Sequence, residues 1–208
     1  MISHPHKFIF IHINKCGGTS IERVLQKYKG QHHKGIHSLL NQYDAKLIKD
    51  YFTFIFVRNP WAKMVSQYHW NGPGATKTYN KGYSGPVYPK KVRGNSAREE
   101  ISFEEYITVY FQEDYILSAG QPATQLPWIS DKEGNLLDID FIGRVENMQE
   151  DFNYVCDKIG IPRQKLAHKH KTHHRSKPYW EYYTDKSRAV VAEKFKKDIE
   201  FFGYEFGK

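Results

Sequence analysis

Residues 7–20 read KFIFIHINKCGGTS, and residues 52–66 read FTFIFVRNPWAKMVS. Each stretch opens with a run of β-branched and aromatic residues, which predicts a buried strand. In the first stretch a Gly-Gly pair follows, and apolar residues then recur at helical spacing through Ile21, Val24 and Leu25. In the second, Pro60 stands where a helix can begin. The order of strand, loop and helix therefore occurs twice in the chain.

Further along the chain the same alternation continues. A third apolar run, residues 139–142, precedes a predicted helix over residues 146–159. Ser102 and Glu105 form a capping-box pattern ahead of a predicted amphipathic helix at 103–111, and a last helix is expected at 186–202. Strands that alternate with helices favour an α/β fold with a central parallel sheet. At 208 residues we expect one domain spanning 1–208.

Composition narrows the class of protein without deciding its function. The net charge of +8 and the isoelectric point near 9.2 favour anionic partners, among them nucleotides, sulfated glycans, nucleic acid and membrane surfaces. Cys16 and Cys156 are too few for a disulfide framework, which favours a reducing compartment. The N-terminal apolar run is too short for a signal peptide or a membrane span. We therefore expect a cytoplasmic protein with no membrane span.

Two long segments are rich in basic residues and contain no acid. Residues 71–98 hold five glycines, three prolines, three tyrosines and six Lys or Arg, and residues 163–177 hold six Lys or Arg and four histidines. Long loops inside compact domains are usually functional or disordered. The first loop could stack its tyrosines on sugar rings and hold acidic groups, or it could be a solvated loop.

The loop from residue 14 to residue 20 has the composition of a phosphate site. It lies between a strand and a helix, where backbone N–H groups and the helix dipole attract an anion. Gly17 and Gly18 allow close backbone approach, Lys15 adds a cation, and Thr19 and Ser20 add hydroxyls. The Walker A pattern is absent because the lysine precedes the glycines. The alternative is a helix capped by Thr19 after a tight glycine turn.

Taken together, FIHINKCGGTSI and FIFVRNPWAKMVSQY resemble the two phosphate-binding motifs of sulfotransferases that use 3′-phosphoadenosine-5′-phosphosulfate (PAPS), in the carbohydrate sulfotransferase branch that includes heparan sulfate 2-O-sulfotransferase. The segments FIGRVENMQEDFNYVCDKIGI and KDIEFFGYEF are also similar to the family. The resemblance implies a three-layer α/β sandwich like that of P-loop NTPases. It also implies PAPS as co-substrate, a hydroxyl acceptor such as a carbohydrate, and no metal for the transfer itself.

The resemblance also assigns residues to roles. Lys15 matches the lysine that contacts the phosphosulfate, and the 5′-phosphate loop matches Cys16, Gly17, Gly18, Thr19 and Ser20. Arg58 and Ser66 match the ligands of the 3′-phosphate, whereas Lys63 stands where many members have arginine. Arg175 and Lys177, in the late basic segment, are candidates for the 3′-phosphate or for a sulfated acceptor.

A general base is needed to accept the proton of the acceptor hydroxyl. His37 lies 22 residues after Lys15, similar to the position of the catalytic histidine in uronyl 2-O-sulfotransferases, and an imidazole suits this role. The alternative is an exposed histidine or a helix N-terminal residue, with His32 and His33 as weaker candidates for the base. Arg144 and Glu146 resemble another family segment, where an internal ion pair and a substrate contact are both open.

Other functions remain as alternatives. A zinc site formed by His168, His170, His173 and His174 is disfavoured by the surrounding lysines and by the lack of a cysteine partner. A P-loop kinase or NTPase is opposed by the order of the lysine and the glycines. A basic nucleic-acid-binding module could use both loops on phosphate backbones, but the sequence carries no recognised DNA- or RNA-reading motif.

Overall fold

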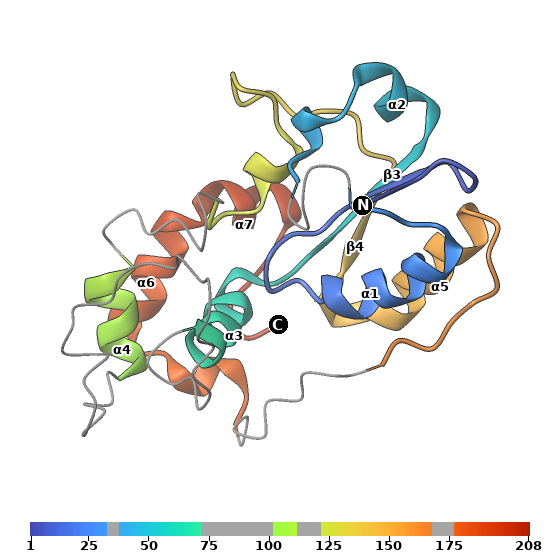
Figure 1. Cartoon of the computed structure of the whole chain (residues 1–208). Helices are drawn as coiled ribbons and strands as arrows, with labels where there is room; N and C mark the ends of the chain where they lie inside the picture. Colours follow the sequence, from blue (N-terminus) through green and yellow to red (C-terminus); the bar gives the residue numbers. More distant parts are fainter. Residues whose placement is uncertain (33–37, 72–101, 112–121, 168–176) are drawn as a thin grey trace, which may run out of the picture. The chain divides into compact units, whose positions relative to one another are not determined.

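The computed structural model describes residues 1–32, 38–71, 102–111, 122–167 and 177–208 (Figure 1). The chain divides into two compact units. The first unit comprises Met1–Arg58 and Gln125–Lys171, and the second comprises Asn59–Thr124 and Thr172–Lys208. Each unit is described separately below, and the expected single domain over 1–208 stays a prediction.

A four-stranded sheet forms the centre of the first unit. Its strands, in spatial order, are β1 (Ile2–Ser3), β2 (Phe8–Ile11), β3 (Phe52–Val57) and β4 (Phe141–Arg144). β2, β3 and β4 run parallel, with Phe8 opposite Phe52 and Phe54 opposite Phe141. The mixed α/β class and the mostly parallel sheet are therefore confirmed. β1 pairs antiparallel with β2, which the sequence did not indicate because two residues are too few for a periodic pattern.

The third strand begins two residues later than predicted. Asp140, which the prediction placed inside the strand, lies just before β4. Its carboxylate accepts hydrogen bonds from the Thr53 N–H at 2.6 Å and from the Thr53 hydroxyl at 2.9 Å. Its side chain thus binds the neighbouring strand ahead of the regular ladder. Regular pairing starts only at Phe141, opposite Phe54.

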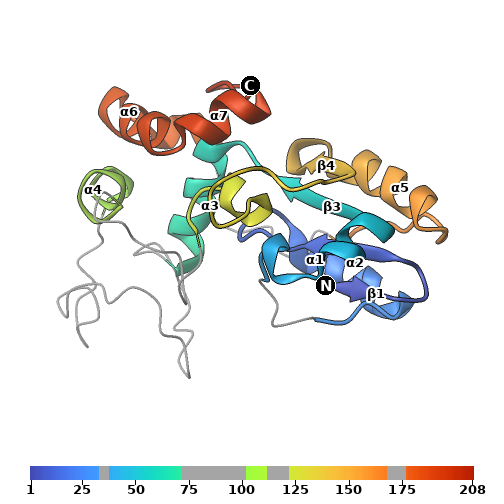
Figure 2. The ribbon, with the colours of Figure 1, turned by 90° about the horizontal axis from the view of Figure 1, so that it is seen from above.

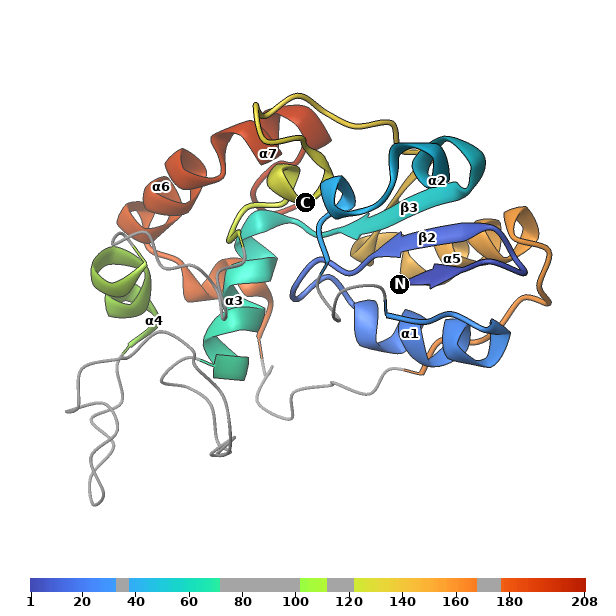
Figure 3. The same ribbon diagram turned by 45° about the horizontal axis from the view of Figure 1, so that its top comes forward.

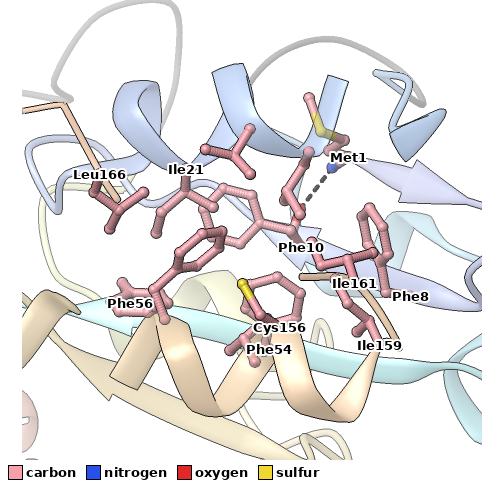
Figure 4. Close-up of a cluster of buried hydrophobic side chains, with 14 residues drawn as sticks. Met1, Phe8, Phe10, Ile21, Phe54, Phe56, Cys156, Ile159, Ile161 and Leu166 are labelled. Carbon is pink, nitrogen blue, oxygen red and sulfur yellow. Dashed lines mark hydrogen bonds between the residues drawn. The ribbon is translucent and has the colours of Figure 1, made fainter. Parts of the chain in front are cut away.

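Helices of the first unit are α1 (Gly18–Leu25), α2 (Ala45–Asp50) and α5 (Met148–Lys158), with short 3₁₀ turns at Gln26–Tyr28, Leu40–Gln42, Leu126–Ile129 and Val145–Asn147. α1 and α5 lie along the same face of the sheet (Figure 3). Alternate strand residues point to this face, so Phe8, Phe10, Phe54 and Phe56 pack against the apolar sides of both helices (Figure 4). The sheet and the two helices thereby fix where the loop before α1 emerges.

Helices and aromatic side chains form the second unit. It contains α3 (Pro60–Asn71), α4 (Phe103–Glu105) with a π turn at Tyr106–Tyr110, a 3₁₀ turn at Tyr179–Tyr182, α6 (Asp185–Lys194) and α7 (Lys196–Phe202). The predicted cap is confirmed, because the Ser102 side chain accepts a bond from the Glu105 N–H, but only the first turn of the predicted helix 103–111 is α-helical.

The prediction of one long C-terminal helix over 186–202 was wrong. The helix is divided at Phe195, which gives the consecutive helices α6 and α7 (Figure 2). Phe195 leaves helical geometry with its ring fully buried and stacked on Phe111 at 5.9 Å between ring centroids. Packing of this ring therefore overrides the helical periodicity. Within the described residues, no helix is long and apolar enough to cross a membrane.

Candidate active site

The loop between β2 and α1 contains two left-handed bends. Lys15 has φ +64° and Gly17 has φ +75°, a region that residues with a Cβ seldom adopt. At Gly17 a Cβ would lie 2.5 Å from the terminal methyl carbon of Met148, and at Gly18 it would lie 2.1 Å from Cδ2 of His12. Backbone geometry therefore accounts for Gly17, and close packing against the His12 ring accounts for Gly18.

Helix α1 begins at Gly18, directly after this loop. The first turn of a helix offers backbone N–H groups and the positive end of the helix dipole, which together can hold a phosphate. Thr19 is exposed at this end. The Ser20 hydroxyl, in contrast, donates a hydrogen bond to the Ala167 carbonyl at 2.8 Å, so its proton is already engaged by a protein group.

Arg58 follows β3 as Lys15 follows β2, and these two strands are parallel neighbours. Their carboxyl ends therefore lie at the same edge of the sheet, where open α/β sheets bind ligands. The Arg58 guanidinium donates from Nη1 to the Lys15 carbonyl oxygen at 3.2 Å. The structure thus brings together the first predicted phosphate loop and the arginine of the second motif.

A buried histidine–glutamate pair lies beside the loop. Nδ1 of His12 is 2.9 Å from Oε1 of Glu22, and the two side chains are 7% and 9% exposed. Nδ1 of His32 lies 3.8 Å from the same oxygen. Burial raises the pKa of Glu22, but the interactions with His12 and His32 lower it by more in total. The pKa of Glu22 therefore lies below its ordinary value. The pair links the end of β2 to the first turns of α1.

The remaining residues of the second motif belong to the second unit. Ser66 is half-buried on α3. Lys63 is fully buried, donates from Nζ to the Ala123 carbonyl at 2.6 Å and lies 5.7 Å from the centre of the Phe195 ring. Its ammonium therefore serves the interior of this unit. That Ser66 and Arg58 hold one phosphate stays a prediction.

Several predicted site residues lie outside the described part of the chain. These are His33, His37, Arg175, most of the loop 71–98, and the histidines of the predicted basic segment. Lys177 is described and donates to the Glu181 carbonyl at 2.8 Å. Glu146 is exposed, and the Arg144 N–H donates to the Asp151 carboxylate at 2.6 Å, so their roles stay open. Among the described residues, no group of three or more His, Cys, Asp or Glu side chains is arranged to hold a metal.

Sequence reasoning missed two residues that contact the predicted loops. Glu22 pairs with His12, and Gln125 is a fully buried side chain that contacts Cys16 and Arg58. Glu22 could have been noticed as an acid within an apolar helical pattern. Gln125 lies in an irregular segment without periodicity, so nothing in the sequence near it signals a role.

Comparison with known proteins gives one family. The sequence model described as the Sulfotransferase family matches residues 1–205. Carbohydrate sulfotransferase 14 of Danio rerio is 23% identical, over 98% of this chain and 61% of its own length. Carbohydrate sulfotransferase 9 of Homo sapiens is 24% identical, over 95% of this chain and 47% of its own length.

A further relative comes from Archaeoglobus fulgidus. This uncharacterized protein is 30% identical, over 60% of the present chain and 80% of its own length. The present chain spans about half to three fifths of the two carbohydrate sulfotransferases above. No solved structure gives a significant match.

Proposed function

Because this chain belongs to the sulfotransferase family, we propose that it transfers a sulfuryl group from PAPS to a hydroxyl of a carbohydrate. One observation carries the proposal furthest. The loop 14–20 and Arg58 follow neighbouring parallel strands, and the Arg58 guanidinium contacts the Lys15 carbonyl at 3.2 Å. Two anion-binding segments side by side suit a nucleotide with phosphate groups at two positions. We further propose that the sheet is the centre of a three-layer sandwich like that of P-loop NTPases.

In this proposal the first segment holds the 5′-phosphosulfate. Backbone N–H groups at the start of α1 and the Lys15 ammonium stabilise the charge that the leaving phosphate gains as the sulfuryl group departs. Arg58, with Ser66 as a predicted partner, binds the 3′-phosphate through charge-assisted hydrogen bonds. Lys63 is assigned no contact with the nucleotide, because its ammonium already binds the Ala123 carbonyl inside the second unit.

The proposal for the acceptor rests on the relatives and on net charge. The relatives are named carbohydrate sulfotransferases, and the net charge of +8 suits an acidic sugar. We propose His37 as the base that takes the hydroxyl proton, with His32 as the described alternative. His32 lies 3.8 Å from Glu22, so an acidic side chain stands beside this alternative base.

Titration calorimetry tests the donor half of the proposal. The protein should bind adenosine 3′,5′-bisphosphate more tightly than ATP, adenosine 5′-monophosphate or a single-stranded oligonucleotide. Arg23→Ala is a matched control for Arg58→Ala, because Arg23 is an exposed arginine on α1 of the same unit. Tighter binding of ATP would indicate a kinase or NTPase, and tighter binding of the oligonucleotide would indicate a nucleic-acid-binding module. Transfer of labelled sulfate from PAPS to a glycan panel then tests the acceptor half.

A further inference from the structure

Gln125 is a fully buried polar side chain. It precedes the 3₁₀ turn Leu126–Ile129 in the first unit, and its exposed fraction is 0%. A buried amide without partners would cost about 1–3 kcal/mol, so its hydrogen bonds decide whether the position is tolerated. The groups that satisfy this amide come from both predicted phosphate segments.

Both peptide groups of Arg58 bind the same side chain. The Arg58 N–H donates to Oε1 of Gln125 at 2.8 Å, and Nε2 of Gln125 donates to the Arg58 carbonyl at 3.0 Å. The two bonds resemble the pair of N–H···O=C bonds that opposite residues exchange in an antiparallel ladder, and they occur directly after the end of β3. It therefore fixes the backbone from which the guanidinium extends.

The same oxygen also reaches the first segment. The Cys16 thiol donates to Oε1 of Gln125 at 3.3 Å. Cys16 follows Lys15, whose carbonyl accepts the bond from the Arg58 guanidinium at 3.2 Å. The contacts thus close a ring that runs from Gln125 to Arg58, on to Lys15 and Cys16, and back to Gln125.

The left-handed bend at Lys15 gives this ring its importance. A residue with a Cβ at φ +64° is strained and persists only where its surroundings hold it. The bonds at the Lys15 carbonyl and at the Cys16 thiol both lie directly after this bend. They tie the chain that leaves the bend to Arg58 and Gln125.

We propose that Gln125 is a positioning residue that holds Arg58 and the Lys15 bend in fixed register before the nucleotide binds. The inference rests on the proposed function for the identity of the ligand. Gln125 itself touches no phosphate, and it acts through Arg58 and the loop. A preformed pair of anion sites reduces the ordering cost of binding, so loss of Gln125 should reduce selectivity as well as affinity.

Gln125→Met tests the proposal, since methionine keeps the length of the side chain and removes the three bonds described above. The preference for adenosine 3′,5′-bisphosphate over adenosine 5′-monophosphate should fall about tenfold, the scale of one or two lost hydrogen bonds. In an Arg58→Ala background the same substitution should leave this preference unchanged. Equal losses for both nucleotides would overturn the proposal, because a merely structural role predicts them.

Gln149→Met is the matched control. The Gln149 amide also bridges backbone groups in the first unit, donating to the Gln164 carbonyl and accepting from the Leu166 N–H. Its loss should lower stability and leave the nucleotide preference intact. A similar change of preference in this control would count against a specific role for Gln125.

Gln125→Glu gives a second test if the methionine variant fails to fold. A protonated carboxyl group has one donor and one acceptor and can replace the amide, whereas a carboxylate can only accept. Burial raises the pKa of a carboxyl group. The preference of Gln125→Glu for the bisphosphate, divided by that of wild type at the same pH, should therefore recover as pH falls from about 8 to about 5.5. A ratio independent of pH would refute the proposal.

Thiol alkylation separates this inference from the proposed function, because it needs no nucleotide. Cys16 and Cys156 are both buried free thiols. Gln125→Met should speed alkylation of Cys16 at least several-fold and leave Cys156 unchanged. Unchanged Cys16 reactivity would refute the positioning role even if the bisphosphate binds. Altered reactivity in a protein that binds no bisphosphate would refute the proposed function and leave the positioning of the loop supported.

Discussion

Removing His12 should destabilise the first unit strongly, because it leaves the Glu22 carboxylate buried. The two groups are 2.9 Å apart, and neither side chain is more than 9% exposed. Removing one partner of a buried pair typically costs about 3–5 kcal/mol, far more than an exposed pair contributes. The His12 ring also stacks on Phe10 at 6.0 Å between centroids. We therefore expect His12→Ala to lower the free energy of unfolding by at least about 3 kcal/mol.

Glu22→Gln is the matched perturbation. It removes the charge and keeps the shape, so no isolated ion remains, and the loss should be about 1 kcal/mol, the scale of one hydrogen bond. The double variant His12→Ala with Glu22→Gln should be more stable than His12→Ala alone. Urea unfolding followed by circular dichroism measures all three. A loss below about 1 kcal/mol in His12→Ala, or no recovery in the double variant, would refute the reasoning.

The pH dependence gives an independent check of the same pair. The pKa of Glu22 is lower in the folded protein than its ordinary value of 4.5. Stability from this group is therefore fully present above about pH 4.5 and is lost as pH falls through the lowered folded value. Wild type should lose more stability than Glu22→Gln between pH 5 and pH 3. Parallel curves for the two proteins would show that Glu22 does not contribute.

Three further predictions concern the proposed reaction. Lys15→Ala should lower kcat far more than it weakens binding of adenosine 3′,5′-bisphosphate, because its charge acts on the leaving phosphate, and wild-type turnover at saturating PAPS would contradict this. Arg58→Ala should weaken PAPS binding by about 1.5–3 kcal/mol and erase the preference for a 3′-phosphate, as calorimetry with adenosine 5′-phosphosulfate would reveal. His37→Ala should slow transfer about 10²–10⁴-fold and flatten the acidic limb of kcat/KM, and an unaltered profile would move the base to His32, His33 or Glu146.

The strands around the two motifs were predictable because their signal is local. Residues 52–57 are a continuous apolar run, and the structure has β3 at Phe52–Val57. The glycine pair likewise predicted the start of α1, which begins at Gly18. The split at Phe195 was not predictable, because it accompanies a contact between two rings, of Phe195 and Phe111, that are far apart in the sequence. The π turn after α4 was not predicted either.

Within the candidate site, residue types were predictable and most contacts were not. The lysine, the glycines and Arg58 stand in motifs, so their neighbourhood at one sheet edge follows from parallel strands. The bonds of Gln125 join residues that are 67 and 109 positions apart in the sequence. Such long-range contacts leave no periodic pattern. The cytoplasmic location inferred from the cysteine count stays a prediction.

The close approach of Gly18 to His12 limits how this site can vary among homologous proteins. A Cβ at position 18 would fall 2.1 Å from Cδ2 of the His12 ring and 2.4 Å from Nε2, so the imidazole occupies the volume that any side chain would need. Positions 12 and 18 should therefore covary, with a residue larger than glycine at 18 tolerated only beside a smaller one at 12. Selection for revertants of Gly18→Ala in a Glu22→Gln background, where position 12 can change without removing the partner of a buried carboxylate, should accordingly return substitutions that shrink position 12. A screen that never finds them would show that the loop can shift to accommodate the methyl group.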